Sequence, residues 1–178
     1  MLAKTPTPLS IGVVGGGIGG LTAALCLART GHQVQVFEKT DECVATGAGI
    51  QVSPNASRVL HQLGLQDALM AKGFLPLATQ MRSWRSGRVI SETALGDAAV
   101  ERYGAPYYHI HRGDLIKMLV SAVAEEPAIA LRLSSEVTDF DQDASGVRLV
   151  AGEHEQRVDL LIGADGIHSA VRARLWGD

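Results

Sequence analysis

The sequence predicts an α/β fold built around a parallel sheet, and three observations support this. An apolar run at 9–14 has the length of a buried strand and leads directly into the glycine-rich turn Gly15 to Gly20. Apolar residues then recur at helical spacing up to Ala28, and a second apolar run follows at 34–37. Strand, helix and strand in this order form a β-α-β unit with parallel strands and a right-handed crossover. We therefore predict a Rossmann-like domain.

The next elements have recognisable start and stop signals. The first helix has Arg29 in its last turn and Gly31 as its C-cap. A second helix starts with Ser53 as N-cap and Pro54 in the first helical position, and Gly64 ends it. Further elements are predicted as a short helix at 66–71, a hairpin of 81–84 and 88–91, a strand at 107–110, and a helix from Arg112 that stops before Pro127.

The last third of the chain predicts a β-meander inserted before a final parallel strand. The strand-like runs are 129–133, 137–140, 147–150 and 158–162. Ser145-Gly146 and Gly152 separate them, as turn residues do. The last run leads into a second glycine turn, after which Ser169 can cap a helix over 170–176.

Composition and charge exclude several classes of function. The net charge is -3 and no run of Lys or Arg is present, so nothing indicates nucleic-acid binding. Two cysteines without a His/Cys cluster predict neither a disulfide framework nor a metal site, and suit a cytoplasmic protein. The segment 9–28 carries no charge, but its glycines favour a strand, a turn and a buried helix over a membrane span.

The first glycine turn predicts a dinucleotide site. Gly15, Gly17 and Gly20 form a G-x-G-x-x-G pattern between a strand and a helix, and Ile18 opens that helix. The three glycines permit a tight turn, close approach of backbone to a pyrophosphate and close packing of helix on strand, and the helix N-terminus attracts the anion. Glu38 ends the second strand, where its carboxylate can accept hydrogen bonds from ribose hydroxyls and would repel a 2′-phosphate. A solvated charge at a strand end is the alternative interpretation of Glu38.

Two more charged residues have open interpretations. Arg112 stands at a helix start, where a cation is unfavourable by a few tenths of a kcal/mol. Either Asp114 compensates it locally, or Arg112 faces an electron-rich group such as a cofactor. Asp165 lies in the second glycine turn and is expected near the first, because ligands gather at the carboxyl ends of parallel strands. Asp165 as a turn former is the alternative.

The histidines His109, His111 and His168 are interpreted as local hydrogen-bonding residues, and no side chain is assigned a catalytic role.

Three segments together resemble the single-component FAD-dependent aromatic-ring hydroxylases, the group of salicylate, 3-hydroxybenzoate and 6-hydroxynicotinate hydroxylases. The order and spacing of these segments match the family across nearly the whole chain, and their combination is more specific than the first turn alone. The segments are Val13 to Leu21 through Glu38-Lys39, Gly47-Ala48-Gly49-Ile50-Gln51 with Pro54-Asn55-Ala56, and Ile110 to Leu115 with Gly163 to Arg172.

The resemblance implies a glutathione-reductase-like flavoprotein fold that binds FAD, with NADH or NADPH as electron donor. It implies that Arg112 contacts the flavin side of FAD and that Asp165 belongs to the family's Asp-Gly motif. The FAD site would comprise Gly15, Gly17, Ile18, Gly20, Glu38, Lys39, Ala48, Arg112, Val137 and Asp165. In such enzymes a flavin hydroperoxide, formed with O₂, hydroxylates a phenol-like or heteroaromatic carboxylate. The implied partners are therefore this small aromatic substrate and O₂, and a homodimer is one option for assembly.

The chain also departs from the family pattern. Relatives often carry a basic residue shortly before Gly47, where this chain has Ala45-Thr46. Family members are about twice as long, so we expect residues 1–178 to be an FAD-binding domain, with 74–106 contributing to the sheet of a substrate domain whose remainder is absent. We expect this chain alone to be inactive. Another FAD-dependent reductase or dehydrogenase, or a non-catalytic dinucleotide-binding module, are the alternatives.

Overall fold

The computed structural model describes residues 7–43 and 47–177, which divide into two compact units. The first unit contains Met1–Val44 and Leu119–Asp178, and the second contains Ala45–Met118. Helix α5 (Arg112–Glu125) contributes residues to both. Within the described part of the chain, no helix is both long enough and apolar enough to cross a bilayer.

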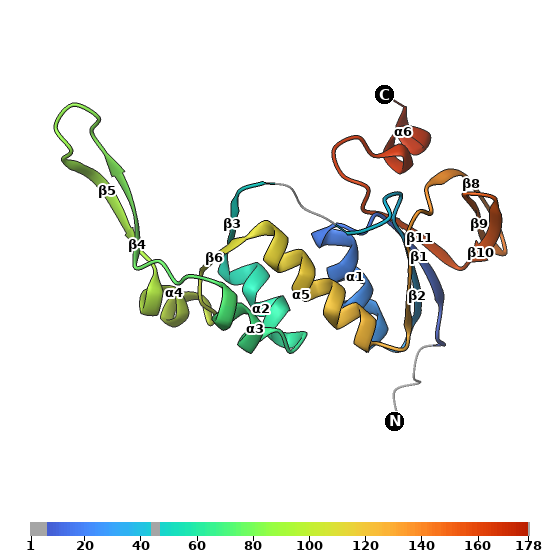
Figure 1. The fold of residues 1–178 in the computed structure, drawn as a ribbon, viewed down its shortest axis with the longest axis horizontal. Helices are drawn as coiled ribbons and strands as arrows, with labels where there is room; N and C mark the ends of the chain where they lie inside the picture. The colour runs from blue at the N-terminus through green and yellow to red at the C-terminus, as the bar shows by residue number, and fades with distance from the viewer. Residues whose placement is uncertain (1–6, 44–46, 178) are drawn as a thin grey trace. The chain divides into compact units, whose positions relative to one another are not determined.

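The first unit is built on a parallel sheet with strand order β11-β1-β2-β7 (Figure 1). These strands are β11 (Leu160–Gly163), β1 (Ser10–Val14), β2 (Gln33–Phe37) and β7 (Ile129–Arg132). Helix α1 (Ile18–Arg29) connects β1 to β2 and packs on one face of the sheet through Leu21, Ala24 and Leu25, which are buried. This confirms the predicted β-α-β unit. Gly31 caps α1 with φ +91° and donates its N–H to the Ala28 carbonyl.

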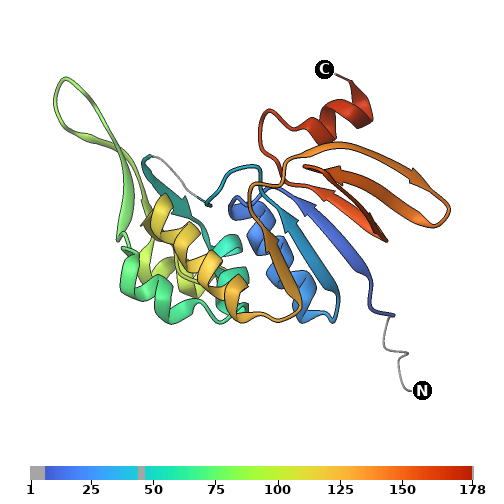
Figure 2. The same ribbon diagram turned by 45° about the vertical axis from the view of Figure 1, so that its right-hand side comes forward.

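The antiparallel meander β8 (Val137–Asp143), β9 (Gly146–Ala151) and β10 (His154–Val158) precedes the last parallel strand, as predicted (Figure 2). Its apolar side chains join those of the sheet and of α6 (Ala170–Trp176) in one core. That cluster contains Val14, Phe37, Val137, Val147, Leu149, Ala151, Val158 and Val171. Gly12 of β1 is part of this packing, because a Cβ on it would meet the Leu161 and Leu149 side chains at 2.9 and 3.3 Å.

The predicted strand at 158–162 is divided in two by Asp159. Val158 ends β10, while β11 begins at Leu160 and pairs with β1. Asp159 donates its N–H to the Ser10 carbonyl at 2.8 Å and accepts the Ser10 N–H on Oδ2 at 2.7 Å. These two bonds join residues 149 positions apart and turn the chain from the meander into the parallel sheet.

The described part of the second unit contains a two-stranded antiparallel sheet, three complete helices, the start of α5 and a hairpin. Strand β3 (Gly49–Val52) pairs with β6 (Tyr108–His111), and the helices are α2 (Pro54–Gln62), α3 (Gln66–Lys72) and α4 (Gly96–Tyr103). The hairpin of β4 (Ala78–Arg82) and β5 (Val89–Ala94) extends away from these helices (Figure 1). The sequence did not predict β3, α4 or β10, which lack a clear periodic pattern. Ser53 occupies the predicted N-cap of α2, but its hydroxyl bonds Asn55 Oδ1 at 2.6 Å and makes no capping bond.

Candidate functional site

The first glycine turn connects β1 to α1 in a conformation that requires glycine. Gly15 has φ +106° and donates its N–H to the Phe37 carbonyl at 2.8 Å, which fixes the turn to the end of β2. A Cβ on Gly20 would lie 1.9 Å from the Gly15 carbonyl oxygen. Only glycine therefore allows α1 to start so close to the strand, as the G-x-G-x-x-G pattern predicts.

The middle of the turn faces open space. A Cβ on Gly17 would meet no atom within 4 Å, so a ligand can approach this backbone closely. Gly17 is the N-cap of α1 and has no side chain to cap it, and Ile18 begins the helix. The first N–H groups of a helix lack carbonyl partners within the helix, and they carry a partial positive charge. This end of α1 is therefore suited to an anion such as a diphosphate.

Glu38 is fixed beside this turn by three hydrogen bonds. Its Oε2 accepts the Gly16 N–H at 2.6 Å, and its Oε1 accepts the Thr40 N–H at 3.0 Å and the Thr40 hydroxyl at 2.8 Å. Partial burial alone would raise the pKa of Glu38. The bonds from Thr40 and Gly16, with the charge of Lys39, outweigh burial and lower that pKa below its ordinary value. Glu38 is thus an ionised acceptor held against the glycine turn, and its role toward a ribose stays a prediction.

Asp165 lies beside the same turn, in the loop between β11 and α6. A Cβ on Gly15 would be 3.0 Å from the Asp165 Cα, so the two glycine turns are in contact as predicted. Asp165 Oδ1 accepts the Ser169 hydroxyl at 2.6 Å, and Oδ2 accepts the Val171 N–H at 3.2 Å. Burial opposes its ionisation, but these bonds outweigh burial and lower the pKa of Asp165. Ser169 caps α6 as predicted, since its Oγ accepts the Arg172 N–H at 3.0 Å.

The two turns border a cavity of about 270 Å³ that lies entirely in the first unit. Six predicted site residues line this cavity or its rim: Gly15, Gly17, Glu38, Lys39, Val137 and Asp165. The sequence did not predict Ser135, Glu136, His168 and Ala170, which also line it. The Ser135 N–H donates to the Glu38 carbonyl at 2.8 Å. Its position after β7, at the carboxyl end of a parallel strand, is the signal that could have indicated it.

Four predicted site residues do not line this cavity. Ile18 and Gly20 belong to the first turn of α1, whereas Ala48 and Arg112 belong to the second unit. There the Arg112 N–H donates to the Ala48 carbonyl at 3.3 Å, which joins the start of α5 to the residue before β3. The Arg112 side chain is exposed, and Asp114 lies in the same first helical turn. Both interpretations of Arg112 stay open. The departure at Ala45-Thr46 lies outside the described residues.

The histidines differ in their surroundings. His111 accepts the Gly113 N–H on Nδ1 at 3.2 Å, which is a local role as expected. The His109 ring contacts the rings of Phe74 and Tyr107. Its Nε2 is buried without a hydrogen-bond partner among the described residues, contrary to that expectation. Nowhere in residues 7–43 and 47–177 do three His, Cys, Asp or Glu side chains gather as a metal site would require.

The comparisons with known proteins agree with the geometry of the turn. Residues 9–176 match a family model described as an FAD binding domain. The chain is 47% identical over 171 residues to 3-amino-4-hydroxybenzoate 2-monooxygenase of Streptomyces cremeus, covering 96% of this chain and 43% of the relative. It is 36% identical to 6-hydroxynicotinate 3-monooxygenase of Bordetella bronchiseptica, covering 94% of this chain and 43% of that relative. The chain thus spans less than half the length of these relatives.

Solved structures show the same relationship. The crystal structure of Klebsiella pneumoniae HpxO complexed with FAD and uric acid matches with a TM-score of 0.78 and 31% identity, over 93% of this chain and 41% of that one. The tetrameric form of 2-methyl-3-hydroxypyridine-5-carboxylic acid oxygenase matches with a TM-score of 0.76 and 29% identity, over 92% and 41%. The predicted flavoprotein fold is confirmed by these matches.

Proposed function

The chain belongs to the family of FAD-binding domains found in flavin-dependent monooxygenases, and from this premise we propose how it contributes to an enzyme. In the whole protein, it holds FAD while an NAD(P)H-dependent reaction with O₂ hydroxylates a phenol-like or heteroaromatic carboxylate. The observation that carries the proposal is the meeting of the Gly15–Gly20 turn, Glu38 and Asp165 at one cavity.

The residues of this cavity fit the adenosine-diphosphate half of FAD. The open space over Gly17 admits a diphosphate to the amides at the start of α1. The Glu38 carboxylate borders the same cavity and can accept hydrogen bonds from the adenosine ribose. A negative Glu38 would repel a phosphate on the ribose 2′-oxygen, which favours FAD over a 2′-phosphorylated nucleotide.

Each of the remaining proposed residues would have its own task. The Val137 side chain would supply an apolar wall, and Lys39 a positive charge near the adenosine. We assign Ala48 and Arg112 of the second unit to the flavin side of FAD, and 74–106 to the sheet of the substrate domain. When bound, FAD supplies the transfer of electrons from NAD(P)H to O₂, whereas the protein orients the cofactor and excludes water.

Two unpaired cysteines, Cys26 and Cys43, support a reducing, cytoplasmic location. Assembly into a homodimer stays a prediction, as does NADH or NADPH as the electron donor.

Purification of the full-length protein tests the proposal. We expect a yellow protein with flavin absorbance, whose NAD(P)H oxidation is stimulated by an aminohydroxybenzoate or hydroxynicotinate, with O₂ uptake and a hydroxylated product. A well-folded preparation that neither carries nor takes up FAD would contradict it. Reduction of an acceptor without ring hydroxylation would instead select a reductase or dehydrogenase, and FAD binding without electron transfer would select a non-catalytic module.

A further inference from the structure

We infer that Thr40 is a positioning residue that holds the Glu38 carboxylate in the orientation needed to bind the adenosine ribose. This inference rests on the proposed function, because it concerns the same nucleotide site. Thr40 follows the end of β2 by three residues and contacts Glu38 through both its backbone N–H and its hydroxyl.

The hydrogen bonds on Glu38 are distributed unevenly. An ionised carboxylate has about four acceptor positions, two on each oxygen. Thr40 occupies both positions on Oε1, at 3.0 Å from its N–H and 2.8 Å from its hydroxyl. Gly16 occupies one position on Oε2, at 2.6 Å. Among the contacts of the described residues, the acceptor position that stays open is therefore on Oε2, the oxygen that accepts the Gly16 N–H.

Thr40 is itself held in place from two sides. Its hydroxyl lies 2.7 Å from the Glu42 carbonyl oxygen, so its single proton is shared between that oxygen and Glu38 Oε1. Its own carbonyl accepts the Ser134 N–H at 2.8 Å, which ties it to the loop after β7. A residue anchored in this way can fix the rotation of the Glu38 carboxylate. With the Gly16 bond alone, the carboxylate could rotate and Oε1 would have no fixed position.

This arrangement decides which oxygen of Glu38 is available to the nucleotide. With Oε1 filled, Glu38 offers Oε2 to the ligand, close to the turn where the diphosphate would lie. A nucleotide whose ribose 2′-hydroxyl donates to Oε2 can at the same time place its diphosphate on the amides at the start of α1. Thr40 also favours the ionised form of Glu38, because its two hydrogen bonds stabilise the negative charge.

Calorimetric titration of the flavin-free protein with ADP and with 2′-deoxy-ADP tests the inference. Thr40→Val keeps the shape and the backbone N–H of the residue but removes the hydroxyl. We expect it to weaken ADP binding about five-fold, the effect of one hydrogen bond. Binding of 2′-deoxy-ADP, which lacks the hydroxyl that Glu38 would accept, should change less than two-fold. Thr40→Ser should restore the wild-type affinity, and Thr40→Ala serves as a second variant if Thr40→Val does not fold.

The pH profile gives an independent readout. In Thr40→Val the pKa of Glu38 should rise, so the loss of ADP affinity on acidification should start at a higher pH than in the wild type. Equal weakening of both nucleotides, or no rescue by serine, would show a merely structural role and overturn the inference. Wild-type protein that binds neither ADP nor FAD would overturn the proposed function itself, which is a distinguishable result.

Discussion

Strands β1 and β4 are both five residues long, yet their surroundings differ completely. Four of the five residues of β1 are buried, whereas none of those of β4 is. Strand β1 has a parallel neighbour on each side, with α1 on one face of the sheet and the β8–β10 meander on the other. Strand β4 pairs only with β5, all of whose residues are exposed. Burial in this chain is thus decided by the layers around a strand as much as by its own residues.

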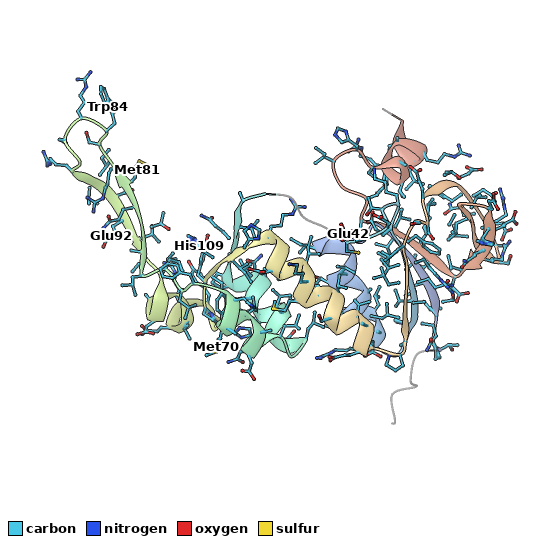
Figure 3. The ribbon with its side chains drawn as sticks, viewed as in Figure 1. Glu42, Met70, Met81, Trp84, Glu92 and His109 are labelled. Carbon is cyan, nitrogen blue, oxygen red and sulfur yellow. The ribbon has the colours of Figure 1, made fainter. Side chains whose placement is uncertain are left out.

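Several large apolar side chains of the hairpin are nevertheless exposed. Met81 on β4 is 61% exposed and Trp84 near the tip is 87% exposed (Figure 3). Ile90 on β5 is 65% exposed. An isolated two-stranded sheet is marginally stable, and its free edges invite further strands. This contrast supports the proposal that 74–106 contributes to a larger substrate-domain sheet, while the first unit already encloses its own core.

The largest expected effect tests how tightly the first unit is packed. Gly20→Ala would place a Cβ 1.9 Å from the Gly15 carbonyl oxygen, so the glycine turn must open. We expect a loss of about 3 kcal/mol in the free energy of unfolding, together with loss of bound flavin. Chemical denaturation and flavin absorbance measure both quantities.

Gly19→Ala is the matched control, because its Cβ would meet no atom within 4 Å. Alanine is favoured over glycine inside a helix by up to about 1 kcal/mol, so this variant should be at least as stable as the wild type. Similar stability of the two variants would refute the close packing of α1 on the turn.

Removal of Asp165 should have the next largest effect. Asp165→Ala removes the acceptors of the Ser169 hydroxyl and the Val171 N–H and should cost about 2 kcal/mol of unfolding free energy. Ser169→Ala removes the α6 cap and should cost about 1 kcal/mol. Asp41→Ala, at an exposed aspartate, provides the control in the same denaturation series.

Acid should destabilise the first unit through the same carboxylates. The pKa values of Glu38 and Asp165 are lowered in the folded state from 4.5 and 3.8. Groups with a lowered folded pKa stabilise the fold above their unfolded pKa and lose that contribution as the pH falls through the folded pKa. We expect stability to be flat near neutral pH and to fall below about pH 4.5. The loss of unfolding free energy at low pH should be shallower in Glu38→Gln and Asp165→Asn. If both variants lost stability at low pH as the wild type does, these two carboxylates would not be its cause.

The smallest effect on this chain is expected at the hairpin. Trp84→Ser should change its unfolding free energy by less than about 0.5 kcal/mol, because the side chain is 87% exposed. In the full-length protein we expect the same change to cost about 2 kcal/mol, since a covered tryptophan would then be lost. Thermal denaturation of both proteins measures this difference. If Trp84→Ser had an equally small effect in the full-length protein, the hairpin would not be covered by the rest of that protein.

Sequence reasoning succeeded where local chemistry determines structure. The G-x-G-x-x-G turn, the acid after β2 and the Ser169 cap each depend on residues close together in the chain, and they were placed correctly. It failed for β3 and β10, because their alternation is weak. The partner of β3 lies far along the chain in β6, whereas β10 pairs with the adjacent strand β9. Ser135 was also missed, since only the folded sheet brings its loop beside Glu38. Thr40 was missed although it is two residues from Glu38, because the side-chain conformation of Glu38 decides that contact. The roles of Ala48 and Arg112 stay predictions.

The pairing of β1 with β11 has a consequence for how the protein is made. Asp159 and Ser10 are 149 positions apart, and β11 ends only at Gly163. On the ribosome, the first strand emerges early but must wait for nearly all of this chain before its partner exists. Contacts of such long sequence separation are costly to close and tend to form slowly. The β1–α1–β2 segment therefore spends most of its synthesis with the β1 edge that will pair with β11 uncovered.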